Sequence, residues 1–339
     1  MTATIKRASD QISGTITAPP SKSMAHRAVL CAALAEGRSH ITNLEFSKDI
    51  SATLGAAGQL CANVQTGRDD AVVEGLGHFL PLAAPVDCCE SGSTLHLIPP
   101  VESRSYIDMT RAVQAAFGVQ SRWLDENTLF LPGNQHYHPC DYAVEGDYSQ
   151  AAFPAVLGAV CGGVTITGLA PETLQGDAVI LDILRRCGAQ FTREGDAVTF
   201  AKAPLHGVDI DLADCPDLGP VLMVLGLLCE GTTVIRNAER LRLKESDRIA
   251  AMEAELRAVG GLVESEGGTI TVQGCADRLH APAGILHGHN DHRVVMSLAV
   301  LALSTGLALT VDDAEAITKS WPNFFDAIKP LGAEVEYAG

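Results

Sequence analysis

The residues best suited to chemistry are Lys and Arg side chains placed where helices are expected to begin. In APPSKSMAHR, from Ala18, Ser21 or Ser23 can cap a helix, and Lys22 and Arg27 then lie in its first turns. A cation there opposes the helix dipole, whereas the backbone N–H groups favour an anion. A bound phosphate would satisfy both, although an ordinary capped helix with a solvated Lys explains this segment equally well.

A second such segment is RLRLKESDRI, from Arg240. Lys244 and Arg248 are four residues apart and alike in charge, which costs a few tenths of a kcal/mol, roughly, unless a counter-ion is present. Glu245 lies three residues before Arg248. Two cations and a carboxylate at one helix start could hold an anion and move a proton, and the alternative is a common Glu–Arg surface pair.

A third segment is GHNDHR, from Gly288, which opens a mostly apolar helix. Asn290 or Asp291 is the expected cap, and Arg293 lies in the first turn. Three histidines stand nearby: His287, His289 and His292. Their spacing crosses from a loop into a helix, and no Cys or carboxylate cluster of a known zinc pattern accompanies them. We therefore expect no metal here.

The fourth segment, AITKSWPNFF from Ala316, is expected to begin a helix at Pro322, with Ser320 as the cap and Lys319 just before it. Each of the four signals is weak alone, and together they indicate a site for more than one anionic group. A carboxylate of another kind, Asp217, follows Pro216 at the start of a long apolar helix. It is either a helix cap or a base for a substrate hydroxyl.

These helix starts belong to an internal repeat. Four segments share a small residue, a short strand of alternating pattern, a polar break and then a helix that ends near a Gly. They begin at Glu36, Cys161, Cys229 and Ser304. The sequence separation between the anchor residues Gly37 and Gly163 is too short for two full repeat units and too long for one. Between them, ESGSTLHLIP from Glu90 is expected to start a helix, and the strand that should open the next unit is missing.

Composition restricts the class of protein. The 339 residues suffice for two domains, and 47% apolar with 19% charged residues is typical of a globular chain. The net charge of −17 disfavours nucleic acid and anionic membranes as partners. We find no membrane-spanning run and no signal peptide. The ten scattered cysteines indicate reduced thiols and a cytoplasmic location.

In these segments the chain resembles the 5-enolpyruvylshikimate-3-phosphate synthase family. The motifs that carry the resemblance occur in the family's order: PPSKSMAHR, ESGSTL, VEGDYSQAAF, CPDLGP, LKESDR, NDHR and TKSWPNFF. The resemblance implies an α/β enolpyruvyl-transferase fold, in which two domains of repeated β-α-β-α-β-β units close over shikimate-3-phosphate and phosphoenolpyruvate. It also implies a monomer that uses no metal or organic cofactor.

The resemblance also implies roles for individual residues. Lys22 would contact both substrates, Asp217 would orient or deprotonate the 5-hydroxyl, and Glu245 would exchange the proton at the methylene carbon. Shikimate-3-phosphate would be held by Ser23, Arg27, Ser103 and Tyr106. Phosphoenolpyruvate would be approached by Gly92 and bound by Arg248, Arg293 and Lys319, with Lys244 and His292 nearby.

The chain departs from the family in its N-terminal domain. His96 stands where the family usually has Arg, and the block between it and ESRSYID is absent. That block carries the Q-R-P and S-S-Q-F motifs, whose side chains hold both substrates. We therefore expect an incomplete N-terminal domain at 21–144, on the shikimate-3-phosphate side. The C-terminal domain, 1–20 with 145–339, is expected to be complete and to hold phosphoenolpyruvate.

Two other functions stay open. A truncated, non-catalytic homologue or small-anion-binding remnant is favoured by the broken junction at Leu95–Ser103, whose uncovered faces would also allow self-association. A UDP-N-acetylglucosamine enolpyruvyl transferase is less favoured. That family has Lys-Asn where this chain has Lys22-Ser23, and its reactive Cys loop is not found here.

Overall fold

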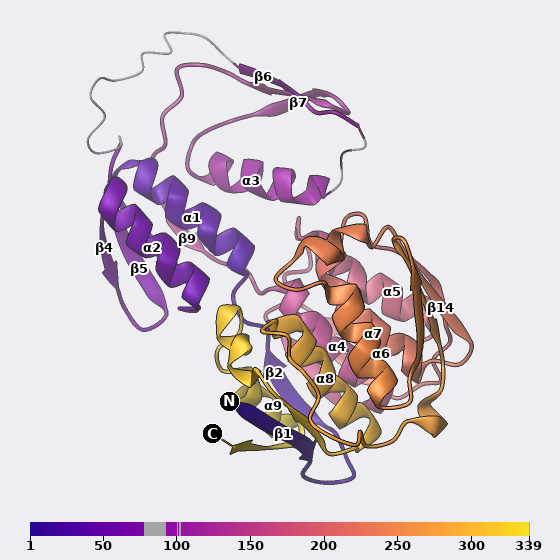
Figure 1. Ribbon diagram of the computed structural model, residues 1–339. Helices are drawn as coiled ribbons and strands as arrows, with labels where there is room; N and C mark the ends of the chain where they lie inside the picture. The colour runs from indigo at the N-terminus through magenta and orange to yellow at the C-terminus, as the bar shows by residue number, and fades with distance from the viewer. Residues whose placement is uncertain (78–92, 100, 102, 339) are drawn as a thin grey trace. The chain divides into compact units, whose positions relative to one another are not determined.

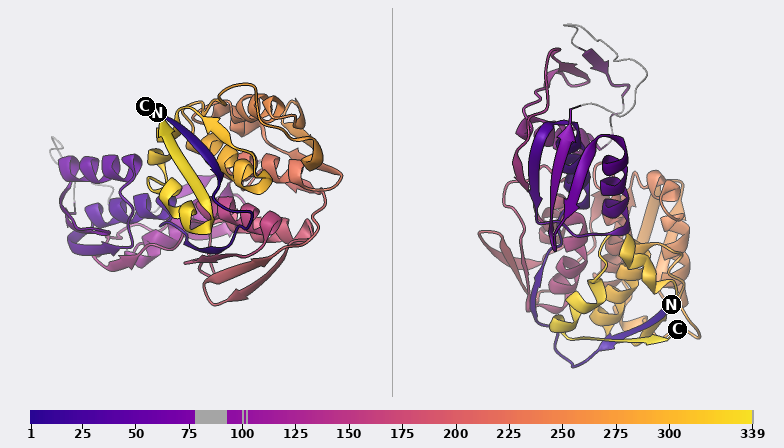
Figure 2. Two further views of the ribbon diagram at one scale, coloured as in Figure 1. Left: turned by 90° about the horizontal axis from the view of Figure 1, so that it is seen from below. Right: turned by 90° about the vertical axis from the view of Figure 1, so that its left-hand side faces the viewer.

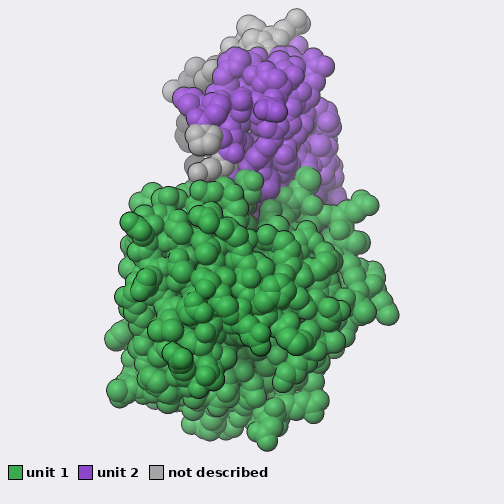
Figure 3. Space-filling model, turned by 90° about the vertical axis from the view of Figure 1, so that its right-hand side faces the viewer, with its two compact units in different colours: residues 1–19, 146–339 green, residues 20–145 purple. Residues whose placement is uncertain are grey.

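The structure, a computed structural model, describes residues 1–77, 93–99, 101 and 103–338 (Figure 1). They form two compact units: unit 1 is Met1–Pro19 with Gly146–Gly339, and unit 2 is Pro20–Glu145 (Figure 3). Each unit encloses its own cluster of buried apolar side chains and mixes helices with short strands, as the α/β prediction requires. Within the described residues, no helix has the length and apolar character needed to span a membrane.

Two sheets of unit 1 repeat one strand order: a hairpin, an opening strand antiparallel to it, and a parallel partner. Every second residue of the strand that follows Gly163 is buried, as its alternation predicts. The first sheet contains β2 (Gly14–Thr17), β10 (Val164–Thr167), β11 (Gln190–Glu194) and β12 (Ala197–Ala201). The second contains β13 (Asp209–Asp211), β14 (Thr232–Arg236), β15 (Leu262–Glu266) and β16 (Thr269–Gln273).

The third sheet of unit 1 joins the two ends of the chain. Its strands are β1 (Thr2–Arg7), β17 (Leu309–Val311) and β18 (Ala333–Ala338). The central strand β1 is antiparallel to both neighbours, and its register with β18 runs from Thr2 opposite Ala338 to Arg7 opposite Ala333. Figure 2 shows these two strands side by side near the termini.

Three helices form the centre of unit 1: α4 (Tyr148–Cys161), α6 (Gly219–Leu228) and α8 (His292–Thr305). They pack against one another and are buried on nearly all sides, which agrees with sequences that are apolar all round. Asp147 caps α4 and Asp291 caps α8, each by accepting a hydrogen bond from a backbone N–H of the first turn. The polar residues of this core are therefore gathered at the helix starts.

Three further helices and six 3-10 turns lie around this core within the described residues and connect the strands of unit 1. They are α5 (Ile180–Arg186), α7 (Arg248–Ala258) and α9 (Phe324–Ile328), with 3-10 turns η1 (Gly176–Val179), η2 (Pro216–Leu218), η3 (Glu239–Leu243), η4 (Ala276–Arg278), η5 (Ala314–Lys319) and η6 (Lys329–Leu331). The glycines predicted to stop helices, Gly188, Gly260 and Gly332, follow α5, α7 and η6 with positive φ. These three predictions are confirmed.

One predicted helix start in unit 1 is wrong. The expected cap, Ser320, instead ends η5, and the helix begins at Phe324 rather than at Pro322. The chain makes an extra turn because the N–H groups of Ser320 and Trp321 both bond to the carbonyl of Ile317. Lys319 consequently lies at the end of a 3-10 turn.

Unit 2 contains one sheet of the same order as those in unit 1. It consists of β3 (Glu36–Thr42), β4 (Ala62–Thr66), β5 (Asp70–Leu76) and β9 (Asp141–Ala143), with β9 as the parallel partner. Three helices accompany it: α1 (Lys22–Leu34), α2 (Lys48–Leu60) and α3 (Arg104–Ala116). Their apolar faces meet over the sheet, with Val113 and Phe117 of the α3 end fully buried.

The second sheet of unit 2 has three strands within the described residues: β6 (Ser93–His96), β7 (Arg122–Asp125) and β8 (Thr128–Leu131). The predicted helix start in ESGSTLHLIP is therefore wrong over residues 93–96, which pair with β8 as a strand. In the other sheets of this strand order, the place beside the hairpin belongs to the opening strand, which the sequence predicts to be missing from this unit. Thr94 and Leu95 suit a strand, so this segment takes the open position.

The two separate cores predict separate responses to core truncation. Phe117→Ala should cost about 3–5 kcal/mol because it leaves a cavity in unit 2. Hydrogen-exchange mass spectrometry should then show lost protection confined to residues 20–145. Phe153→Ala, which truncates a buried ring of α4 in unit 1, is the matched control and should give the opposite pattern. Equal loss of protection in both units after either change would contradict two independent cores.

Candidate active site

Asp217 is the centre of the charged cluster in unit 1. It lies in η2 at the start of α6, and its carboxylate meets Arg248 at 3.0 Å, Lys244 at 3.2 Å and Arg293 at 3.2 Å. Burial by itself would raise the pKa of Asp217, but the charges of Arg293, Lys244 and Arg248 outweigh it and hold the pKa far below its usual range. Three cations therefore converge on one ionised carboxylate.

Arg248 links this carboxylate to two others. Its side chain is only 1% exposed, and its Nε lies 2.8 Å from an oxygen of Asp291, which is fully buried. A third nitrogen contacts Glu245. Because Arg has five N–H donors in a fixed planar arrangement, it can serve three carboxylates at once.

The structure places Arg248 as the first residue of α7, with Asp247 as its cap. Lys244 and Glu245 lie before the helix, in the turn that follows η3. The prediction that all three charges share one helix start is therefore only partly right. The like charges of Lys244 and Arg248 are instead balanced by Asp217, which comes from another element.

The start of α8 completes the cluster. Arg293 also donates to the backbone carbonyl of Asp217 at 3.0 Å. Buried His292 lies with Nδ1 3.7 Å from an oxygen of Glu245. Lys319 donates to the carbonyl of Asn290, two residues before α8. Contacts within unit 1 thus join seven predicted site residues: Asp217, Lys244, Glu245, Arg248, His292, Arg293 and Lys319.

The three histidines predicted not to form a metal site lie beside different carboxylates in the structure. His287 pairs with Asp312 at 2.6 Å and His289 with Glu255 at 2.9 Å. Among the described residues, the group best placed to hold an ion is Glu245, Asp291 and His292, whose ligand atoms lie within 4.8 Å of one another. The guanidinium of Arg248 already bonds to both of those carboxylates, so a metal ion would have to displace it.

A second set of predicted residues lies in unit 2. Arg27 donates to the carbonyl of Ser23 at 2.6 Å and to that of Tyr106 at 3.2 Å, and its guanidinium lies 5.9 Å from the centre of the Tyr106 ring. Lys22 pairs with Asp49 at 2.9 Å. Ser103 precedes α3 in a left-handed conformation, φ 54°. The start of α3 is thereby joined to α1 through Arg27.

Two further predicted positions differ from these. Gly92 lies outside the described residues. His96, which stands where the family usually has Arg, is exposed on β6 and bonds to the Thr128 hydroxyl at 3.2 Å. That bond holds β6 to β8, so within the described residues the His96 ring serves the small sheet.

The sequence analysis missed Asp177 as a site residue. It lies in η1, is 5% exposed, and shares its electrostatic surroundings with Asp217 and Arg293. The internal repeat contained a signal, because Asp49, Asp177 and Asp247 follow their strands at equivalent places in SKD, QGD and ESD. Asp49 pairs with Lys22 and Asp247 with Arg242, whereas Asp177 is the buried member of the set.

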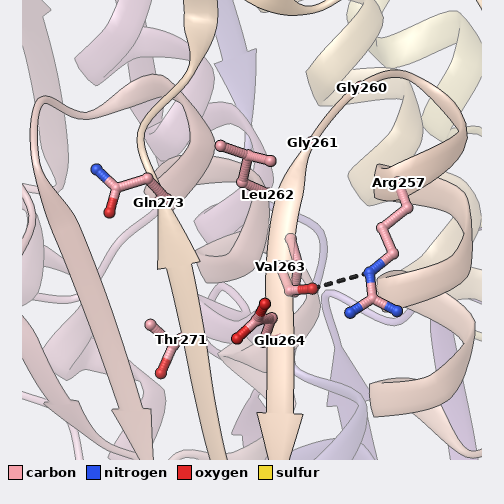
Figure 4. Close-up of a pocket in the computed structure, with 8 residues that line it drawn as sticks. All are labelled: Arg257, Gly260, Gly261, Leu262, Val263, Glu264, Thr271 and Gln273. Carbon is pink, nitrogen blue, oxygen red and sulfur yellow. Dashed lines mark hydrogen bonds between the residues drawn. The ribbon is translucent and has the colours of Figure 1, made fainter.

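The pocket in Figure 4 lies elsewhere. It has a volume of about 620 Å³ and is formed by the end of α7 with β15 and β16. Arg257 closes one side by donating to the carbonyl of Val263 at 2.9 Å. Its eight lining residues include none of the predicted site residues.

The buried network predicts an unequal cost for removing two Arg side chains from one helix. Arg248→Met should destabilise the protein by about 3–5 kcal/mol, because fully buried Asp291 would lose its counter-ion. Arg257→Met, the control on α7, removes a half-exposed pair with Glu253 and should cost about 1 kcal/mol or less. Urea unfolding followed by circular dichroism measures both. Similar midpoints for the two variants would refute the importance assigned to Arg248.

Comparison with known proteins agrees on one family. Residues 6–105 and 97–328 match the family model described as EPSP synthase (3-phosphoshikimate 1-carboxyvinyltransferase). The 3-phosphoshikimate 1-carboxyvinyltransferase of Clostridioides difficile is 30% identical over 96% of this chain and 97% of its own length. The enzyme of the same name from Clostridium kluyveri is 29% identical over 96% of each chain.

Solved structures share the fold. EPSP synthase from Acinetobacter baumannii matches with a TM-score of 0.79 at 19% identity, covering 99% of this chain and 100% of the other. The enolpyruvyl transferase NikO from Streptomyces tendae matches with a TM-score of 0.80 at 16% identity, covering 99% of both.

The comparisons also bear on the missing block. The alignment with the Clostridioides difficile enzyme runs over 424 positions, more than the 339 residues of this chain, so part of that enzyme has no counterpart here. The family match breaks into two segments that meet at residues 97–105, where the block was predicted to be absent. The chain therefore belongs to the EPSP synthase family of enolpyruvyl transferases.

Proposed function

We propose that this protein transfers the enolpyruvyl group of phosphoenolpyruvate to the 5-hydroxyl of shikimate-3-phosphate and releases phosphate. The observation that carries the proposal is the convergence of Lys244, Arg248 and Arg293 on Asp217. Phosphoenolpyruvate brings a phosphate and a carboxylate, and Arg pairs with both by parallel hydrogen bonds. No step of the proposed reaction uses a metal or an organic cofactor.

The cluster can make Asp217 a base when it is needed. Without substrate, three cations keep its carboxylate ionised and weakly basic. Substrate anions that attract Arg293, Lys244 and Arg248 remove part of that stabilisation, so the proton affinity of Asp217 rises. Asp217 then takes the proton of the 5-hydroxyl while the hydroxyl oxygen forms a bond to the enol carbon of phosphoenolpyruvate.

Glu245 is assigned to the methylene carbon. A proton delivered to the methylene carbon completes the tetrahedral intermediate. Phosphate then leaves as the bond between it and the former enol carbon breaks, and a proton leaves the carbon that was protonated, which restores the double bond. Glu245 contacts Arg248 and lies near His292, so its charge is supported at the same place. Lys319 at the end of η5 supplies a further cation for the phosphate.

We assign shikimate-3-phosphate to unit 2. Arg27 with Ser23, Ser103 and Tyr106 would hold its phosphate and ring, and Lys22 would contact both substrates. Gly92 is kept in this proposal from the resemblance alone. We expect the protein to work in the cytoplasm as a monomer, although the open edge of β6 offers a surface for self-association.

Turnover should be impaired by the missing block. The family's Q-R-P and S-S-Q-F side chains are absent, and His96 replaces an Arg. Each lost charge-assisted hydrogen bond to a phosphate costs about 1.5–3 kcal/mol. The same observations favour a second candidate, a non-catalytic protein that binds small anions through the unit 1 cluster.

Phosphate release with both substrates separates the two candidates. We expect slow release by the purified protein, and a further loss of about 10²–10⁴-fold in Asp217→Ala, because the proton acceptor is removed. Asp209→Ala, an exposed position in unit 1, is the matched control and should retain the rate. Absence of release from folded protein would favour the anion-binding candidate, and full-rate turnover would contradict impairment.

The role of Glu245 has its own test. Glu245→Gln should abolish exchange of the methylene hydrogens of phosphoenolpyruvate with D₂O in the presence of shikimate-3-phosphate, because no acid–base group then serves that carbon. Proton NMR follows the exchange directly. Glu253→Gln on α7, which pairs with Arg257, is the control. Exchange that persists in Glu245→Gln at the unchanged rate would assign the proton to another residue.

A further inference from the structure

Asp177 is a buried carboxyl group fixed beside the charged cluster of unit 1. Its Oδ1 has no hydrogen-bond partner among the described residues. Gln175, two residues before Asp177, holds η1 against the start of α4. Its Nε2 donates to the carbonyl of Gly146 at 2.8 Å, and its Oε1 accepts from the N–H of Tyr148 at 3.1 Å. Asp177 is thus held in place while one oxygen of its buried carboxyl group has no partner, which disfavours the ionised form.

The charged groups around Asp177 come from three elements. The start of α4 contributes Asp147 and the Ser149 hydroxyl, η2 contributes Asp217, and α8 contributes Arg293. The Cys215 thiol, just before η2, also faces it. Burial, followed by the charge of Asp217, raises the pKa of Asp177 to about 7, against the opposing effect of Arg293.

Asp177 and Asp217 therefore share one cation. Arg293 bonds to the Asp217 side chain at 3.2 Å and to its carbonyl at 3.0 Å, and the charge of the same guanidinium also acts on Asp177. Two neighbouring carboxyl groups whose pKa values are driven in opposite directions generally divide the charged and neutral states between them. Asp217 keeps the negative charge, and Asp177 is the partner that can become neutral.

We propose that Asp177 takes up a proton when a phosphorylated carboxylic acid binds to the Asp217 cluster, which makes it a positioning residue that frees Arg293 for the ligand. The proposal rests on the proposed function, because the ligand is the phosphoenolpyruvate class of anion. An arriving anion attracts Arg293, so the repulsion between the two carboxylates increases. Protonation of Asp177 removes that repulsion and leaves Asp217 as the one charged member of this pair of carboxyl groups.

The sign of the pH dependence follows. Below neutral pH Asp177 is already protonated, and the ligand binds with full affinity. Above neutral pH, each binding event must draw a proton from solution onto Asp177, so the affinity for the ligand should fall by up to about tenfold per pH unit. Asp177→Asn, a neutral side chain of the same shape, should bind with the affinity of the protonated form at every pH.

The binding test uses phospholactate, which has the phosphate and carboxylate of phosphoenolpyruvate but no double bond to react. Isothermal titration calorimetry with shikimate-3-phosphate present, at pH 6 to 8.5 and in buffers of different ionisation enthalpy, counts the protons taken up. The natural protein should show uptake that Asp177→Asn lacks, beyond the proton changes of the ligand itself. Asp182→Asn, a 69% exposed position on α5, should behave as the natural protein. Equal uptake in the natural protein and Asp177→Asn would overturn the proposal.

A ligand-free measurement keeps this result distinct from the proposed function. The folded-state pKa of Asp177 lies above its unfolded value of 3.8, so its ionisation costs stability as pH rises between the two. The melting temperature of Asp177→Asn minus that of the natural protein should therefore increase from pH 5 to pH 8. A constant difference, or failure of the neutral variant to fold, would overturn the proposal. A difference that changes as expected, with no phospholactate bound by either protein, would instead count against the proposed function.

Discussion

The site of unit 1 depends on one buried ionic group, the guanidinium of Arg248. An Arg side chain removed from water is tolerated only where carboxylates match its charge and its hydrogens. Here three acidic side chains do so, and they come from η2, from the turn before α7 and from the cap of α8. The elements that carry these carboxylates are consequently fixed to one another by charge as well as by apolar packing.

The apolar packing explains why the charges meet at all. The three central helices of unit 1 are largely apolar, so their ionisable side chains are accommodated at the helix ends. The repeat then places a helix start after each strand. Duplication of one unit therefore delivers several helix starts to a common region. Arg248 and Arg293 at two of them meet carboxylates from others, which gives a site that no single unit could form.

Much of this could be predicted from sequence because it is local. The Gly stops, the alternating strands and the Asp291 cap each follow from a few neighbouring residues. The contact between Arg248 and Asp291 could not be predicted, because 43 positions separate them and both residues also have ordinary surface explanations. Asp177 was missed for the same reason: its burial is a property of the packed unit. The strand at residues 93–96 was predicted as a helix start from its local pattern, which does not show that His96 pairs with Thr128, 32 residues away.

The pairing of the first strand with the last has a consequence for the order of folding during synthesis. Unit 2 is encoded as one continuous stretch and can collapse once Glu145 has left the ribosome. Strand β1 is made before it, but its partner β18 follows all the other described elements of unit 1 in the sequence, so β1 waits with Ala3 and Ile5 unburied. Unit 1 is therefore completed from both ends of the chain at once, after the other unit has formed, and its early strand is the segment longest exposed to mispairing.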